Sequence, residues 1–173
     1  MKALAKSFVY AWQGLIYCLH NERNMRIHLA FSLYMYSYLL FYDFFELSRL
    51  EFAVIFIANA IVMMGELINT AVETTINLVE KKYNKMAKIA KDTAAAGVLV
   101  SAVFAVAIGV ALLWQPEAFA KLYDYYYENT LMLLCLIASL AASAVYILAG
   151  PLAIRDFLTG KKHGNATTKG AKK

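Results

Sequence analysis

The chain has little charge, proline, glycine or cysteine. Only 17% of its 173 residues are charged, whereas soluble domains carry about a quarter. With 2 prolines and 8 glycines there is little room for long linkers, so one compact helical unit is predicted. Cys18 and Cys135 provide neither a disulfide framework nor a metal-ligand spacing, and we interpret them as buried thiols. No Gly-rich phosphate loop and no Ser-His-Asp arrangement occurs.

Apolar residues are abundant instead, at 61% of the chain with a mean hydropathy of +0.53. This excess indicates contact with lipid. A helix needs about 20 mainly apolar residues to cross a membrane. Four segments meet or approach that length, and we predict an all-α integral membrane bundle. The predicted spans are residues 27–42, 50–72 with a helical continuation to 79, 94–114 and 130–150.

Residues 1–20 form a predicted amphipathic helix. Apolar side chains recur there at spacings of four and three, including Phe8, Trp12 and Leu15. An aromatic-rich helix of this kind suits the headgroup boundary, so we expect it to lie flat on the membrane. The alternative is a helix packed in a soluble core, which the following apolar segments disfavour.

The basic residues indicate an orientation. Fifteen of the 17 Lys and Arg residues fall before the first span, between the second and third, or after the fourth. This alternation predicts that both termini are cytoplasmic. The net charge of +5 is then explained by topology, and a nucleic-acid partner is not expected. The other two connections are acidic and rich in tyrosine, as an outer interface would be. We predict a disordered basic tail at residues 159–173.

Polar residues enter the second span with a helical period. Glu66, Asn69, Glu73 and Asn77 share one stripe, and Asn59 extends it away from the basic connection. Each charged group in a span costs at least a few kcal/mol. Hydrogen bonds between helices would explain the asparagines, but two glutamates on one face favour a functional site.

Further charged residues flank this stripe on the predicted cytoplasmic side. Glu22 precedes the first span and, together with Glu73, provides the kind of carboxylates that hold Mg²⁺. Lys91 and Asp92 stand at the start of the third span and add a cation for phosphate and another carboxylate. Asp92 is explained equally well as a helix N-cap, and His28 as an interfacial residue.

Four blocks together resemble the prokaryotic diacylglycerol kinase and undecaprenol kinase family. They are YAWQG at 10–14, NERNMRIH at 21–28, ELINTAVE at 66–73 and AKDTAAAGVLV at 90–100. Their order and spacing match over about residues 3–114, and the second block is closer to the undecaprenol kinase branch. The fourth predicted span lies outside the resemblance.

The resemblance implies a homotrimeric membrane kinase with an interfacial helix and three spans per chain. Glu66 would be the general base, and Glu22 and Glu73 would hold Mg²⁺ on the ATP phosphates. Asn69 would support Glu66, and Trp12 would support the site or contact the substrate. The other residues implied to contact nucleotide are Tyr10, Lys82, Tyr83, Asn84, Lys91 and Asp92.

The chain departs from the family pattern at Asn77, where Asp is usual, at Gln13, where Lys is common, and at Lys82, where the family has an acidic residue. We divide the chain into a kinase domain at 1–114, an outer connection with an extra fourth span at 115–158, and the tail. Small residues in the fourth span permit close helix packing.

The predicted function is ATP- and Mg²⁺-dependent phosphorylation of a lipid primary hydroxyl in the bacterial inner (cytoplasmic) membrane. Undecaprenol is favoured over diacylglycerol. Two alternatives belong to other classes: an intramembrane cation transporter using Glu66 and Glu73, and a non-catalytic scaffold. The outer half of the second span is apolar apart from Asn59, which disfavours a transport path.

Overall fold

The computed structural model describes residues 2–160, and this part of the chain is helical and contains no strand. The all-α prediction is therefore confirmed. The helices are α1 (Lys2–Asn21), α2 (Arg23–Phe41), α3 (Arg49–Val79), α4 (Lys85–Leu113), α5 (Pro116–Glu128) and α6 (Thr130–Leu158).

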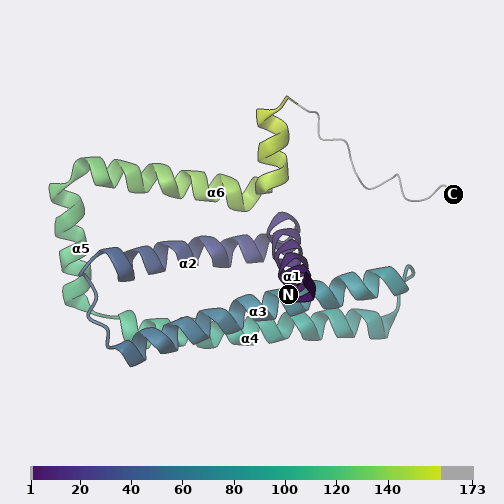
Figure 1. Ribbon diagram of the computed structural model, residues 1–173. Coiled ribbons are helices and arrows are strands. Elements are labelled where there is room, and N and C mark those ends of the chain that lie inside the picture. The colour runs from purple at the N-terminus through teal and green to yellow at the C-terminus, as the bar shows by residue number, and fades with distance from the viewer. Residues whose placement is uncertain (1, 161–173) are drawn as a thin grey trace.

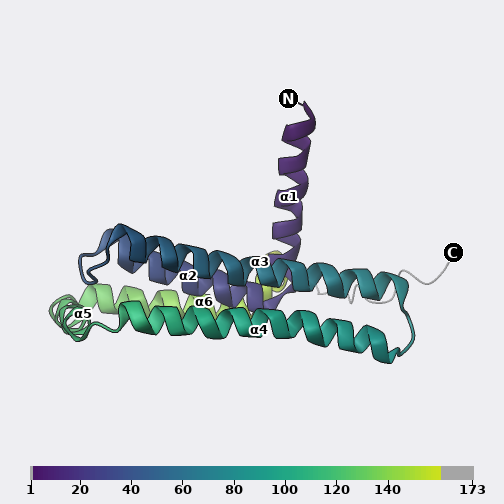
Figure 2. The ribbon, with the colours of Figure 1, turned by 90° about the horizontal axis from the view of Figure 1, so that it is seen from below.

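Four helices run alongside one another in an open row (Figure 1). The order across the row is α6, α2, α3, α4, because α2 contacts both α6 and α3 while α4 packs against α3. Two helices run crosswise to this row. α1 crosses at one end and stands away from the row in Figure 2, and α5 closes the other end. Beyond α1, the paired ends of α3 and α4 continue and carry the basic connection.

Three of the four predicted spans lie in helices that are long and apolar enough to cross a membrane, namely α3, α4 and α6. α2 is not among these three helices. Its 19 residues include two arginines and several hydroxyl-bearing side chains, which lower its mean hydropathy. A membrane span at residues 27–42 therefore stays a prediction.

The ends of α3 and α4 are set by local hydrogen bonds. Ser48 and Glu51 form a capping box at the start of α3, and the predicted continuation to Val79 is confirmed. α4 begins at Lys85, before the predicted span, because the Asn84 side chain accepts from the backbone N–H groups of Met86 and Ala87. The N-cap interpretation of Asp92 was wrong, since Asp92 lies inside α4.

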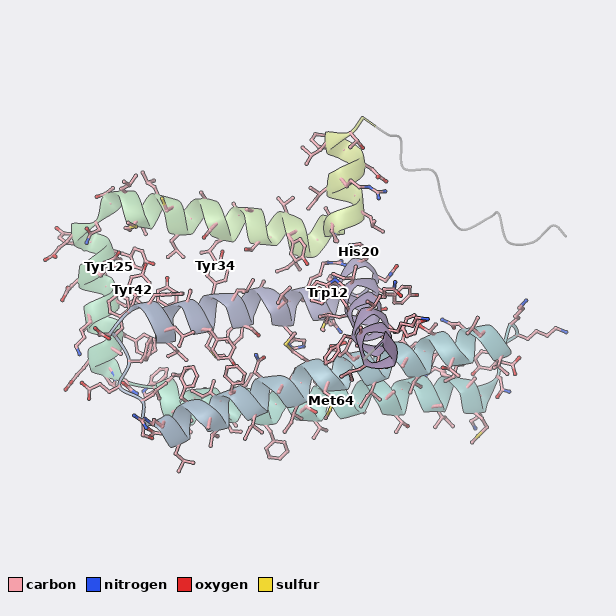
Figure 3. All side chains as sticks on the ribbon, viewed as in Figure 1. Trp12, His20, Tyr34, Tyr42, Met64 and Tyr125 are labelled. Carbon is pink, nitrogen blue, oxygen red and sulfur yellow. The ribbon has the colours of Figure 1, made fainter. Side chains whose placement is uncertain are left out.

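The outer connection forms a helix of its own, α5, which the sequence pattern did not predict. Tyr125 and Tyr126 face the end of α2. The hydroxyls of Tyr38 and Tyr126 lie 2.6 Å apart, and the rings of Tyr42 and Tyr125 meet edge to face at 5.5 Å between centroids (Figure 3). Burial and the Tyr38 hydrogen bond raise the pKa of Tyr126 above its ordinary value. The aromatic cluster joins α5 to α2.

The row leaves most large apolar side chains of α4 and α6 uncovered, as a lipid environment requires. Cys18 is buried and Cys135 is exposed, and both are free thiols. The interpretation of Cys135 as buried was wrong, because α6 contacts its neighbours with other faces. The predicted tail lies outside the described residues apart from Thr159 and Gly160, which form a turn.

Candidate acidic site at the α1–α2 corner

The candidate site lies where the end of α1, the start of α2 and the middle of α3 meet. Cys18 of α1 is 1% exposed, and its Sγ lies 3.1 Å from the hydroxyl oxygen of Thr70 on α3. Thr70 in turn donates to the Glu66 backbone carbonyl at 2.9 Å. These buried contacts hold the amphipathic helix against the polar stripe of α3.

Glu66 is the most deeply buried carboxylate of the site, with 2% of its surface exposed. Its Oε1 has no hydrogen-bond partner within the described residues. The Nε2 atom of His28 lies 3.5 Å from Glu66 Oε1, and the Asn24 side chain lies near the carboxylate. A buried acceptor without a partner is costly, so an oxygen kept in this condition is available for a ligand.

Asn69 and Glu73 continue the stripe one and two turns further along α3. The Asn69 Nδ2 donates to Glu73 Oε1 at 3.2 Å. The Asn69 side chain is 9% exposed, and its Oδ1 has no partner in the described part of the chain. Asn69 therefore contacts Glu73, and its support of Glu66, which the family resemblance implies, stays a prediction.

Glu22 occupies the corner between α1 and α2. Its backbone is extended (φ −103°, ψ 118°), and its side chain does not cap α2. Burial raises the pKa of Glu22 above its ordinary value, and the nearby carboxylates of Glu73 and Glu66 raise it further. The positive charge of Arg26 lowers the pKa of Glu22, against these effects. The electrostatic effect of Glu73 and Glu66 on Glu22 indicates that the three carboxylates lie in one region of the structure.

The donor chemistry fits a magnesium ion held together with a nucleotide. No cluster of three or more His, Cys, Asp or Glu side chains capable of holding a metal occurs in residues 2–160. Mg²⁺ commonly takes only one or two carboxylates and completes its coordination with phosphate oxygens and water. Glu22 and Glu73 can provide those carboxylates, and the unpartnered Glu66 Oε1 and Asn69 Oδ1 are further oxygens beside them.

Lys91 and Asp92 lie on α4 and make separate contacts. The Lys91 Nζ donates to Asn77 Oδ1 at 2.6 Å, whereas Asp92 pairs with Lys88. Asn77, the departure from the family pattern, thus joins α3 to α4 through Lys91. This contact lies one turn beyond Glu73 along α3.

Trp12 and the remaining predicted nucleotide contacts are exposed and lie apart from the corner. Tyr10 and Trp12 are 66% and 63% exposed on α1, with Trp12 visible in Figure 3. The 82–84 stretch lies beyond the end of α3 at Val79, and Val79 is itself about 20 Å along the helix from Glu66. Within it, Asn84 caps α4 and donates to Glu80 Oε2 at 3.1 Å.

Sequence reasoning missed several residues of the site. Asn24 and His28 stand four apart at the start of α2, and that spacing places both on the face toward Glu66. That spacing could have identified Asn24 and His28 as residues of the site. Cys18 and Thr70 carry no such signal, because their contact depends on how α1 crosses α3.

The fold and the site define a helical membrane protein with an acidic site where an amphipathic helix crosses its long apolar helices. The sequence profile described as prokaryotic diacylglycerol kinase matches residues 9–113. The chain belongs to the prokaryotic diacylglycerol kinase family.

Two curated relatives are similar to this chain. One is a diacylglycerol kinase from a Synechocystis species, 39% identical over 114 residues, which covers 65% of this chain and 63% of the relative. The other is an undecaprenol kinase from Bacillus subtilis, 38% identical over 112 residues, which covers 65% of this chain and 88% of the relative. No solved structure matches the chain.

Proposed function

We propose that the chain is an ATP-dependent lipid kinase that phosphorylates a primary hydroxyl at the membrane surface. The observation that carries the proposal is the buried carboxylate of Glu66, whose Oε1 is unpartnered within the described residues and which lies beside two further carboxylates. Phosphoryl transfer needs positioning, charge neutralisation and a base near the acceptor oxygen, and no covalent intermediate.

Glu22 and Glu73 are the residues that would hold Mg²⁺. The ion would neutralise charge on the ATP phosphates, whose oxygens complete its coordination. A cation held by Glu22 and Glu73 would relieve the repulsion that contributes to the raised pKa of Glu22. Asn69 keeps the Glu73 side chain in place through its 3.2 Å hydrogen bond. Asn69 is thus a positioning residue for the metal site.

Glu66 would take the proton from the lipid hydroxyl. A general base must lie within hydrogen-bonding reach of that proton, and Glu66 Oε1, which has no hydrogen-bond partner in the described residues, is able to accept it. The position along α3 supports the role, since Glu66 lies where α1 meets the long apolar helices. An alcohol anchored in lipid can reach this level from one side and ATP from the other.

The nucleotide contacts proposed for Tyr10, Lys91, Asp92 and residues 82–84 are supported by the family motifs alone. Lys91 is the strongest of these candidates, because its ammonium group lies one turn beyond Glu73 at the level of Asn77. The exposed residues Tyr10, Lys82 and Tyr83 are available to solvent and therefore to ATP. We also propose the homotrimer and the cytoplasmic orientation of both termini.

We favour undecaprenol over diacylglycerol as the substrate. The NERNMRIH block at 21–28 resembles the undecaprenol kinase branch, and one of the two similar relatives is an undecaprenol kinase. The block supplies Glu22, Asn24 and His28 to the site, so the part that resembles that branch lies where the lipid hydroxyl would be.

The test is transfer of labelled γ-phosphate from ATP to purified lipids in mixed micelles. We expect magnesium-dependent transfer to undecaprenol and weaker transfer to diacylglycerol. Preferential transfer to diacylglycerol would overturn the substrate, while the kinase proposal would stand. If the folded protein transfers phosphate to neither lipid at any magnesium concentration, the kinase proposal is wrong.

A further inference from the structure

α6 is broken near its end by two residues. Gly150 has φ 76° and ψ 159° inside the helix, and Pro151 follows it. Proline has no N–H, so the carbonyl four residues earlier, that of Ile147, loses its helical donor. The backbone at Gly150 has a conformation that side chains with a Cβ rarely adopt. The break therefore leaves an unpaired carbonyl beside a residue that must be glycine.

Arg26 of α2 fills this break. Its Nε donates to the Ile147 carbonyl at 3.1 Å, and only 6% of the residue is exposed. A Cβ added to Gly150 would lie 3.4 Å from both the Cζ and the Nη1 of Arg26. The guanidinium thus lies within van der Waals contact of a Cβ at position 150, and the φ of 76° there strains any residue other than glycine.

The same guanidinium also holds the end of α1. The Arg26 Nη1 donates to the carbonyls of Leu19 and His20, each at 3.2 Å. Carbonyls in the last turn of a helix have no partner within that helix. Figure 3 shows His20 at the end of α1, close to the bend of α6. One buried cation therefore joins three helices at the corner that carries Glu22.

Glu22 depends on this corner for its position. It links α1 to α2 in an extended conformation and makes no capping hydrogen bond through its side chain. The angle between the two helices is instead held by the hydrogen bonds that Arg26 of α2 donates to the Leu19 and His20 carbonyls of α1. The opposing charge of Arg26, four residues away, also acts on the Glu22 carboxylate.

We propose that Arg26, Ile147, Gly150 and Pro151 form a latch through which α6 positions Glu22 for metal–nucleotide binding. The inference rests on the proposed kinase function. It assigns a role to the helix that lies beyond the family match at residues 9–113. Arg26 acts through Glu22 and is a positioning residue.

The test substitutes Gly150→Ala, with Gly109→Ala in α4 as the matched control, because a Cβ at position 109 meets nothing within 4 Å. The first measurement needs neither metal nor activity. In a Cys135→Ser background, it is the rate at which a water-soluble maleimide labels Cys18. Cys18 is 1% exposed between α1 and α3, and burial raises its thiol pKa, so labelling of the parent is slow.

The second measurement is the magnesium concentration that gives half-maximal phosphate transfer, compared with kcat. Loss of one charged hydrogen bond corresponds to a change of about tenfold or more. We expect Gly150→Ala to speed Cys18 labelling and raise the half-maximal magnesium concentration by about that factor, with kcat within about twofold. Gly109→Ala changes neither quantity. A purely structural defect would lower yield and kcat and leave the magnesium dependence unchanged.

Pro151→Ala is the second variant, used if Gly150→Ala does not fold. It restores an N–H that competes with Arg26 for the Ile147 carbonyl, and the same changes are expected. Arg26→Lys cannot bridge both sets of carbonyls. Combined with Pro151→Ala, it should therefore change the labelling rate and the magnesium dependence little beyond the effect of Pro151→Ala alone. Unchanged labelling and unchanged magnesium dependence in the folded variants would overturn the latch. If the parent transfers no phosphate at all, the kinase proposal fails, and the labelling rates still decide whether the latch exists.

Discussion

Replacement of Glu66 by glutamine separates the proposed base from the rest of the site. The side chain is 2% exposed, and an amide of the same size leaves the packing against α1 and α2 unchanged. What disappears is the ability to accept the proton of the lipid hydroxyl. General-base catalysis contributes roughly 10²–10⁴-fold, or about 3–5.5 kcal/mol of the barrier. We expect Glu66→Gln to lower kcat by that factor.

Nucleotide binding should be retained in the same variant. Glu22 and Glu73 remain in place, and the removal of one of three mutually repelling carboxylates leaves no new charge unpaired. The measurements are labelled phosphate transfer to undecaprenol in mixed micelles and equilibrium dialysis of ATP with magnesium. Glu128→Gln, on the exposed face of α5 at the other end of the molecule, is the control and should match the parent in both assays.

Two results would refute this reasoning. If Glu66→Gln loses ATP binding as completely as phosphate transfer, Glu66 holds the metal–nucleotide complex and does not act as the base. If kcat stays within about tenfold of the parent, the proton is accepted by another group, and Glu66 has no catalytic role of the size that general bases contribute.

Three further predictions concern stability in detergent, each followed by thermal unfolding. Ser48→Ala removes the cap of α3 and should cost about 1 kcal/mol, whereas an unchanged Tm would show that the cap is dispensable. Thr70→Val removes the hydroxyl that contacts Cys18 and should cost about 1 kcal/mol, whereas Thr75→Val, which loses an exposed bond within α3, should cost less; equal losses would argue against the buried contact. Because the folded-state pKa of Glu22 is raised, the folded chain keeps a proton that the unfolded chain has released, and stability falls as pH rises from the ordinary to the raised pKa. Glu22→Gln should flatten that slope, and a slope equal to the parent's would contradict the assignment.

Periodicity along the chain was sufficient for much of the architecture. The spacing of Phe8, Trp12 and Leu15 predicted α1, and the stripe from Glu66 to Asn77 predicted one long α3 with its polar residues on one face. These predictions succeeded because amphipathicity and apolar length depend only on the residues within one helix. The predicted end of the fourth span coincides with the bend at Gly150, although α6 continues beyond the bend to Leu158.

Contacts between helices were a different matter, since they depend on where each helix crosses its neighbours. The sequence by itself determined the all-helical class and the family, and it predicted roles for Glu22, Glu66 and Glu73 that remain proposals. Only the tertiary structure decided that Cys18 contacts Thr70, that Lys91 reaches Asn77, and that Arg26 reaches the carbonyl of Ile147. The physical reason is that a side chain 121 positions away becomes a neighbour through packing alone, and no local period records it.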